Sequence, residues 1–278
     1  MIIEIIKFII LSSLIVIISK YILVKLLRKL AEALNLSAKV VGDISGVATS
    51  VPEFLTVSFS AFAGLAGTSI YNIISSNVIN LIQYIAAVLL NKNQKLLNNK
   101  GIKVQLILVM ATILIPILMI VSKIEFNINF ILVFILLFIL FYYINSNVHK
   151  LYLKKQDEKI YDEIEKEKKW IKGKIKVIIK YLVALLCTSV ILYFIGDNLG
   201  NVLENLKVAF NIPEAIIGIA LGFITSLPEL ITFFESQKHY KKEDAKEGIV
   251  EATNNLLTSN MLNLFIIQTI GIIIINLV

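Results

Sequence analysis

The stretch TSVPEF, residues 49–54, places a proline and a glutamate side by side within an otherwise apolar run of the chain. Nearly the same letters return as TSLPEL at residues 225–230. Pro52 and Pro228 lack the amide hydrogen that the interior of a helix needs, and the glutamate that follows each of them carries a charge. Both features are costly in an apolar segment, so their repetition indicates that the two stretches share a function.

The chain around these stretches has the composition of a membrane protein. Its mean hydropathy is +0.82, and charged residues make up 17% of its 278 residues, compared with about 25% in soluble domains. A spanning helix needs about 20 predominantly apolar residues. We therefore predict an all-α polytopic membrane protein with about eight transmembrane helices. The candidate spans are 2–24, 40–62, 68–90, 104–122, 128–147, 176–195, 208–234 and 249–277.

Basic residues gather in alternate connections between these spans. Segments 20–40, 91–103, 147–176 and 235–248 together contain 23 of the 27 Lys and Arg residues. Short loops rich in Lys and Arg stay on the cytoplasmic side of a membrane. We therefore predict a multi-pass protein of the cell membrane with these segments in the cytoplasm, the loop 147–176 included, and with both termini outside. The net charge of +7 then reflects topology, and we predict no nucleic-acid partner.

A charged insert divides the chain into two halves. We predict a first half over residues 1–148, a charged cytoplasmic loop over 149–175 and a second half over 176–278. Each half contains one copy of a repeat, the first over residues 41–90 and the second over 217–277.

Two alignments define the repeat. VGDISGVATSVPEF (41–54) aligns with IGIALGFITSLPEL (217–230) at a constant offset of 176, and NIISSNVIN (72–80) aligns with NLLTSNMLN (255–263) at an offset of 183. The alignments pair identical polar, glycine and proline residues. These pairs are Gly42 with Gly218, Gly46 with Gly222, Thr49 with Thr225, Ser50 with Ser226, Pro52 with Pro228, Glu53 with Glu229, Asn72 with Asn255, Ser76 with Ser259, Asn77 with Asn260 and Asn80 with Asn263.

The two copies are predicted to run in opposite directions through the membrane. Six predicted spans precede the first helix of the second repeat, an even number, while one span precedes the first helix of the first repeat, an odd number. The helix that contains Glu53 and the helix that contains Glu229 therefore cross the bilayer in opposite senses. Inverted repeats of this kind are typical of secondary transporters, whose binding site lies near the midplane where the two halves meet.

The repeated residues have the chemistry of a cation site. Pro52 cannot bond the carbonyl of Ala48, and Pro228 cannot bond that of Ile224, so both oxygens need other partners. A hard cation such as Ca²⁺ takes 6–8 oxygen ligands, and the two glutamates would balance its charge. An ionised carboxylate at the centre of a bilayer costs at least about 2.5 kcal/mol, and such residues are rare unless they are functional.

The paired TSxPE motifs, each followed by an NxxxSNxxN helix, resemble the two alpha repeats of the calcium/cation antiporter superfamily, and most closely its sodium/calcium exchangers. The resemblance implies exchange of cytosolic Ca²⁺ for external Na⁺ by alternating access. Family members have five helices in each half, so we expect the second repeat of this chain to lack its last two helices. The resemblance implies metal ligands at Thr49, Ser50, Glu53, Ser76, Asn80, Thr225, Ser226, Glu229, Ser259 and Asn263.

We therefore predict an antiporter that exchanges Ca²⁺, or another divalent cation, for Na⁺. A proton-coupled cation exchanger of the same architecture remains an alternative, as does a membrane protein that binds the ion without transporting it. We predict no enzymatic activity, because the apolar spans contain no histidine or cysteine pair, and no cofactor beyond the transported ions. The lipid bilayer and inorganic cations are the predicted partners, and the sequence leaves a homo-oligomer open.

Overall fold

The computed structural model describes residues 2–26, 29–30, 38–153, 157–239 and 245–278. The elements within these ranges are helices, and no strand occurs among them. The predicted all-α class is therefore confirmed. The first half contains α1 (Ile2–Ile18), η1 (Ser19–Val24), α3 (Ala38–Thr49), α4 (Val51–Phe62), α5 (Ala66–Leu90), η2 (Gln94–Asn98), α6 (Lys100–Val121), η3 (Ile128–Phe130) and α7 (Ile131–Leu153). The second half contains α8 (Asp157–Phe210), α9 (Glu214–Thr225), α10 (Leu227–His239), α11 (Ala245–Met261), η5 (Leu262–Ile267) and α12 (Gln268–Leu277).

Seven helical stretches among the described residues are long and apolar enough to cross a membrane. Each of them coincides with one of the eight predicted spans. The remaining predicted span, 40–62, is also helical and forms α3 and α4. Its serines, threonines and charged residues make it less apolar than the other seven spans.

The sixth span extends further than the sequence indicated. The predicted helix ended at residue 195 and was followed by a polar connection over 196–207, whereas α8 continues to Phe210. Leu199, Leu203 and Leu206 are buried at helical spacing along this part of α8. Packing of this apolar face against the protein stabilises the helix despite the glycine, asparagine and glutamate residues between these leucines.

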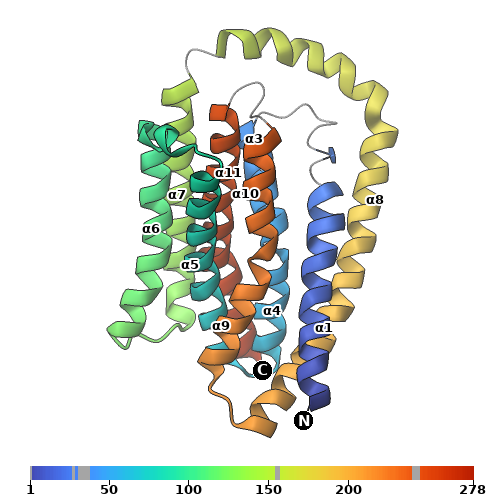
Figure 1. Ribbon diagram of the computed structural model, residues 1–278, viewed down its shortest axis with the longest axis vertical. Coiled ribbons are helices and arrows are strands. Elements are labelled where there is room, and N and C mark those ends of the chain that lie inside the picture. The colour runs from blue at the N-terminus through green and yellow to red at the C-terminus, as the bar shows by residue number, and fades with distance from the viewer. Residues whose placement is uncertain (1, 27–28, 31–37, 154–156, 240–244) are drawn as a thin grey trace.

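The helices alternate in direction as the charge pattern predicted. Figure 1 shows both chain ends at the lower end of the molecule. The junctions of α1 with α3, α5 with α6, α7 with α8, and α10 with α11 lie at the upper end. The described residues of all four lysine-rich segments therefore lie towards one end of the structure.

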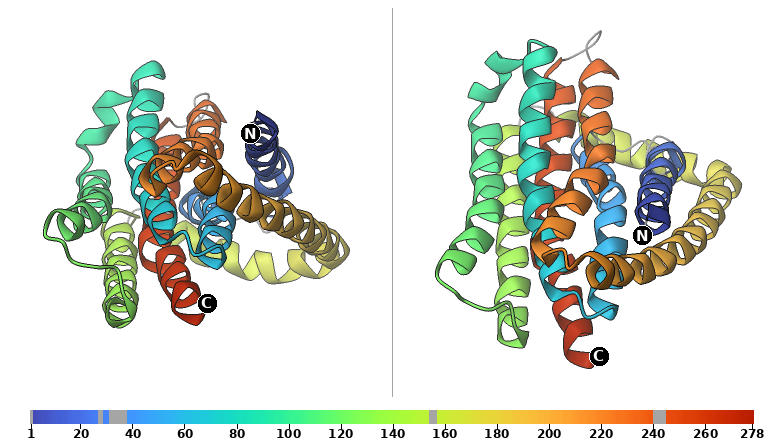
Figure 2. Two further views of the ribbon diagram at one scale, coloured as in Figure 1. Left: turned by 90° about the horizontal axis from the view of Figure 1, so that it is seen from below. Right: turned by 60° about the horizontal axis from the view of Figure 1, so that its bottom comes forward.

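The central helices carry the repeats, and the other helices flank them. Figure 2 shows α6 and α7 on one side of this central group and α1 with α8 on the other. Aromatic contacts join the first flank to the centre: the ring of Phe141 lies 5.2 Å from that of Phe265. On the second flank, Gly196 and Gly200 of α8 lie against the Phe59 side chain of α4. The centre is therefore enclosed on both sides by apolar contacts.

Each repeat begins with a helix that is interrupted at the TSxPE motif. In the first copy α3 ends at Thr49 and α4 begins at Val51, and in the second copy α9 ends at Thr225 and α10 begins at Leu227. Each proline lies within the first turn of the new helix, where its missing N–H group would have no intrahelical partner. The proline therefore starts a helix at membrane depth.

Glycines bring the two repeats into close contact, and they do so symmetrically. A Cβ atom at Gly46 of α3 would lie 2.8 Å from the backbone oxygen of Asn255 on α11. A Cβ atom at Gly222 of α9 would lie 2.7 Å from the backbone oxygen of Asn72 on α5. Asn255 and Asn72 are themselves aligned positions of the repeat. The same pair of helix surfaces is thus used twice, and in Figure 1 α3 with α4 descends while α9 with α10 ascends.

Candidate cation-binding site

The two glutamates lie in equivalent places on the two interrupted helices. Glu53 lies in the first turn of α4 and Glu229 in the first turn of α10. The N-terminus of a helix carries partial positive charge and stabilises an anion there. Both side chains are completely buried, with 0% of their surface exposed. The repeat therefore places two carboxylates in the interior of the protein, each at the start of a helix.

Hydroxyl groups connect the first repeat to the second around these carboxylates. The Ser50 hydroxyl lies 2.9 Å from Oγ of Ser259, and the Ser259 hydroxyl donates to Oε1 of Glu229 at 3.0 Å. A second contact between the repeats is made by the Ser76 hydroxyl, which lies 3.4 Å from Oγ1 of Thr225. The polar side chains of α3, α5, α9 and α11 thus meet at one place between the repeats.

The carboxylate oxygens have few donors. Neither oxygen of Glu53 has a hydrogen-bond partner within the described part of the chain, and the same holds for Oε2 of Glu229. The charge of Glu53 also repels that of Glu229. Two uncompensated carboxylates in a low-dielectric interior are strongly unfavourable, so the arrangement requires positive charge from outside the protein.

Amide oxygens add to this set. Oδ1 of Asn80 and Oδ1 of Asn263 are buried and accept no hydrogen bond from any described residue. Their nitrogens are bonded: Nδ2 of Asn80 donates to Oδ1 of Asn260 at 3.2 Å, and Nδ2 of Asn263 donates to Oδ1 of Asn77 at 3.1 Å. Oγ of Ser226 is likewise buried without a partner. The site therefore presents oxygen lone pairs from carboxylate, amide and hydroxyl groups.

A second pair of asparagines supports the interrupted helices. Nδ2 of Asn72 donates to Oγ1 of Thr56 at 2.6 Å, and Nδ2 of Asn255 donates to Oγ1 of Thr232 at 2.8 Å. Each threonine lies one turn after Glu53 or Glu229. The alignment had paired Asn72 with Asn255 without assigning them a role, and the threonines were missed, although the offset of 176 relates them too.

The chemistry of these groups suits a hard cation and not a soft metal. No group of three or more His, Cys, Asp or Glu side chains that could hold a metal ion occurs among the residues that the structure describes. A zinc site would need nitrogen or sulfur ligands. Carboxylate, amide and hydroxyl oxygens are the ligands that Ca²⁺ and similar ions prefer.

Comparison with known proteins bears directly on this arrangement. A family model described as sodium/calcium exchanger protein matches residues 5–147 and 180–277. The chain belongs to the sodium/calcium exchanger family.

Solved structures of the sodium-calcium exchanger NCX_Mj have the same fold as this family member. One of them, soaked with Na⁺ and no Ca²⁺, aligns with a TM-score of 0.51 at 20% identity, covering 99% of this chain and 84% of that chain. Another, soaked with Na⁺ and Sr²⁺, aligns with a TM-score of 0.52 at 21% identity, covering 99% and 83%. No protein of curated function matched the chain in sequence. The family assignment supports cation exchange transport, and the structural likeness supports the fold.

The ten ligand residues implied by the family resemblance are all buried in this exchanger fold. The structure brings residues of both repeats together, through the contacts of Ser50 with Ser259 and of Ser76 with Thr225. The Thr49 hydroxyl lies 3.4 Å from Oδ1 of Asn255. Their role as ligands stays a prediction. The sequence analysis gave no role to Asn77 and Asn260, whose bonds hold two of the predicted ligands.

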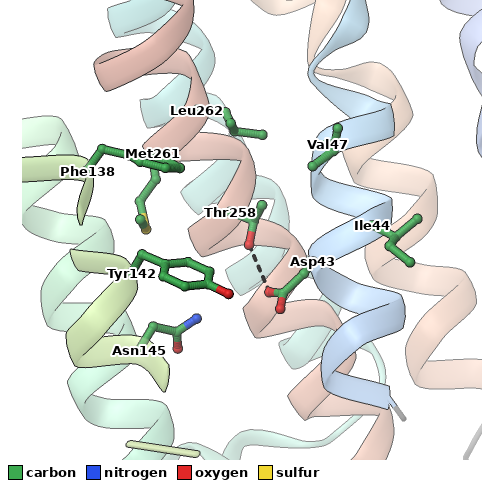
Figure 3. A pocket seen from close by; sticks show the side chains of 9 residues that line it. All are labelled: Asp43, Ile44, Val47, Phe138, Tyr142, Asn145, Thr258, Met261 and Leu262. Carbon is green, nitrogen blue, oxygen red and sulfur yellow. Dashed lines mark hydrogen bonds between the residues drawn. The ribbon is translucent and has the colours of Figure 1, made fainter. Parts of the chain in front are cut away.

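A separate pocket of about 220 Å³ lies between α3, α7 and α11 of this exchanger fold. Figure 3 shows Asp43 at one end of it, with its carboxylate accepting a hydrogen bond from Thr258 at 3.0 Å. Lys39, one turn earlier on α3, pairs with the other oxygen of Asp43 at 3.4 Å. Most of the remaining wall is apolar. Neither Glu53 nor Glu229 lines this pocket.

Proposed function

We propose that this protein is a secondary antiporter that moves Ca²⁺ out of the cytoplasm in exchange for Na⁺ by alternating access. One observation carries the proposal: the interface between the repeats buries oxygen atoms that lack a donor. Six such atoms belong to predicted ligands, namely Oε1 and Oε2 of Glu53, Oε2 of Glu229, Oδ1 of Asn80, Oδ1 of Asn263 and Oγ of Ser226. Ca²⁺ in proteins takes 6–8 oxygen ligands.

Charge balance supplies the coupling. Glu53 and Glu229 together carry two negative charges when ionised, which one Ca²⁺ or two Na⁺ neutralise. A site that has lost Ca²⁺ holds two buried carboxylates close to each other, and moving them uncompensated through the protein is costly. The protein therefore changes its accessible side only with Ca²⁺ or Na⁺ bound, and after it has released Ca²⁺ it returns only once Na⁺ has taken its place. Competition for one set of oxygens is then sufficient for exchange.

Both repeats contribute ligands to the proposed cation site. The glutamates supply the charge, the asparagine amides supply neutral oxygens, and the hydroxyls complete the shell. We propose the following residues as cation ligands: Thr49, Ser50, Glu53, Ser76, Asn80, Thr225, Ser226, Glu229, Ser259 and Asn263.

Movement of α1 and α8 against the central helices is the proposed route to alternating access. In the contact of α8 with α4, Gly196 lies against the Phe59 ring and Gly200 against Cβ and the backbone of Phe59. Small residues allow two membrane helices to pack closely without interlocking. At the end of the molecule that contains the chain termini, Lys207 of α8 pairs with Glu214 of α9. Glu214 also accepts a hydrogen bond from the backbone N–H of Gly67 at 2.7 Å. This ionic link fastens α8 to the centre.

The proposal is tested by ⁴⁵Ca²⁺ exchange in proteoliposomes under an imposed Na⁺ gradient. We expect Glu53→Gln and Glu229→Gln to lower the exchange rate at least about a hundredfold, because each removes one of the two charges that Ca²⁺ requires. Glu125→Gln is the matched control, since Glu125 is exposed between α6 and α7 and should exchange like the parent. If both buried variants exchange as well as the parent, the proposal is wrong.

The same vesicles distinguish the alternatives. Two buried carboxylates also bind protons, so an exchange that follows an imposed pH gradient and ignores the Na⁺ gradient identifies a proton-coupled exchanger. Ca²⁺ binding to the purified protein without any flux identifies a protein that binds the ion and does not transport it. Flux driven by Na⁺ alone supports the proposed coupling.

A further inference from the structure

We infer that Asn77 and Asn260, which are not among the proposed ligands, position the cation site by fixing the orientation of the Asn80 and Asn263 amides. Both side chains are completely buried on α5 and on α11. The offset of 183 makes Asn260 the repeat partner of Asn77. The inference rests on the proposed function, because it concerns how two of its ligands are aimed.

The first step follows from the backbone. Nδ2 of Asn77 donates to the backbone oxygen of Asn260 at 3.2 Å, and Nδ2 of Asn260 donates to the backbone oxygen of Asn77 at 3.2 Å. A backbone carbonyl oxygen can only accept a hydrogen bond. The amide nitrogen of each side chain must therefore face the partner helix, and turning either amide over would place two oxygens against each other.

The second step concerns the amides of the proposed ligands Asn263 and Asn80. Because Nδ2 of Asn77 and of Asn260 is bonded to backbone, the Oδ1 atoms of these two residues face the proposed ligands. Oδ1 of Asn77 accepts a hydrogen bond from Nδ2 of Asn263, and Oδ1 of Asn260 accepts one from Nδ2 of Asn80. An amide nitrogen donates and an amide oxygen accepts. The nitrogens of Asn80 and Asn263 are thereby used, and the Oδ1 atoms of these two residues are the atoms left without a hydrogen-bond partner.

The consequence is a site with oxygens and not N–H groups turned toward the cation. An amide that rotates by half a turn would present a donor to the cation, and a donor cannot ligate it. The two halves differ in one respect: Nδ2 of Asn80 also lies 3.4 Å from Oγ of Ser259, whereas Nδ2 of Asn263 donates to Oδ1 of Asn77. Loss of Asn77 should therefore harm the site more than loss of Asn260.

A double-mutant cycle on the purified full-length chain tests the inference. Equilibrium binding of ⁴⁵Ca²⁺ in detergent is measured with and without competing Na⁺ for Asn77→Ala, for Asn263→Ala and for the double variant. We expect Asn77→Ala alone to weaken Ca²⁺ binding about tenfold and to add less than twofold when Asn263 is already alanine, because Asn77 acts through Asn263. Asn260→Ala with Asn80→Ala should show the same pattern with a smaller effect.

Asn254→Ala is the matched control for a purely structural role. Asn254 is an equally buried asparagine on α11 that bonds Gln105 at 3.0 Å, away from the glutamates. This variant should unfold at a lower temperature and should bind Ca²⁺ within twofold of the parent. If Asn77→Ala does not fold, Asn77→Ser takes its place in the cycle.

Two results would overturn the inference while leaving the proposed function intact. One is parent-like Ca²⁺ binding by Asn77→Ala, and the other is an effect of Asn77→Ala that adds in full to that of Asn263→Ala. A parent protein that binds neither Ca²⁺ nor Na⁺ would overturn the proposed function and this inference together.

Discussion

The contact of α3 with α11 and the contact of α9 with α5 share one backbone design and differ in their polar chemistry. Gly42 and Gly46 lie against α11 as Gly218 and Gly222 lie against α5. The residues around the glycines differ: where the first contact has Asp43, Glu251, Asn254 and Thr258, the second has Ile219, Thr68, Tyr71 and Ser75 at the aligned positions.

The symmetry of the two repeats is closest around the candidate cation site. The serines, threonines, asparagines and glutamates paired by the alignment occur in both repeats. One turn away the two contacts diverge. Asp43 and Thr258 line a pocket together with residues of the flanking helix α7, whose Asn145 accepts a hydrogen bond from Gln105 at 2.8 Å. Polar side chains within a membrane protein need partners, and α7 helps to supply them on that side.

The largest effect is expected from breaking the shared backbone design. Gly222→Ala would place a Cβ atom against the Ser75 side chain and 2.7 Å from the backbone oxygen of Asn72, and Gly46→Ala would place one 2.8 Å from the backbone oxygen of Asn255. We expect each variant to lose about 3 kcal/mol of stability, because overpacking forces the helices apart. Thermal unfolding in detergent measures the loss.

Equal losses for these two glycines would confirm that the two contacts are equivalent. Gly271→Ala is the control, since its nearest contact is one Val57 methyl group at 3.0 Å, which can move aside. A large loss for one of the two glycines and none for the other would show that the contacts are not equivalent.

A smaller effect is expected when an aspartate equivalent to Asp43 of α3 is introduced on α9. Ile219→Asp introduces on α9 the residue that α3 has at position 43, but the position that matches Lys39 is Ala215. An unpaired carboxylate in a membrane helix costs about 2.5 kcal/mol or more on insertion. We expect reduced yield of membrane-inserted protein, measured against Ile219→Leu. Normal insertion of Ile219→Asp would show that pairing at Asp43 is not what makes the acid tolerable.

The smallest effect is expected from the hydroxyl groups at aligned positions 75 and 258. Thr258→Val removes the bond to Asp43 and should cost about 1 kcal/mol, the usual worth of such a bond between membrane helices. Ser75→Ala should lower the stability by only a few tenths of a kcal/mol, because the Ser75 hydroxyl donates at 2.7 Å to the backbone oxygen of Tyr71 in its own helix. Thermal unfolding of both variants compares them, and equal losses would contradict the asymmetry.

The sequence predicted much of the fold because its signals are periodic and local. Apolar length marked the spans, lysine content marked the end on which the connections lie, and the repeated prolines marked the interruptions at Ser50 and Ser226. The continuation of α8 to Phe210 was missed. The sequence of this stretch, which contains glycine and asparagine, predicts a loop, because the packing of its leucines cannot be seen in the sequence.

The candidate site was predicted in part. The glutamates could be named because a charge in an apolar span is a local anomaly, and the hydroxyls because they belong to the repeated motifs that carry the family resemblance. The bonds of Asn77 with Asn260 could not be predicted, since they depend on how α5 meets α11 and their residues are 183 positions apart. Whether an asparagine points its oxygen or its nitrogen into a site depends on its neighbours in space and not on its place in a motif.

Composition, the number of spans and the repeated motifs are enough to predict a membrane protein built from two related, oppositely directed halves, with a carboxylate in each. The packing of distant helices was needed to show that hydroxyl groups of the two repeats meet and that Oδ1 of Asn80 and of Asn263 has no hydrogen-bond partner among the described residues. Hydrogen bonds between distant helices are directional and short, so their partners are fixed by packing and cannot be read from spacing alone.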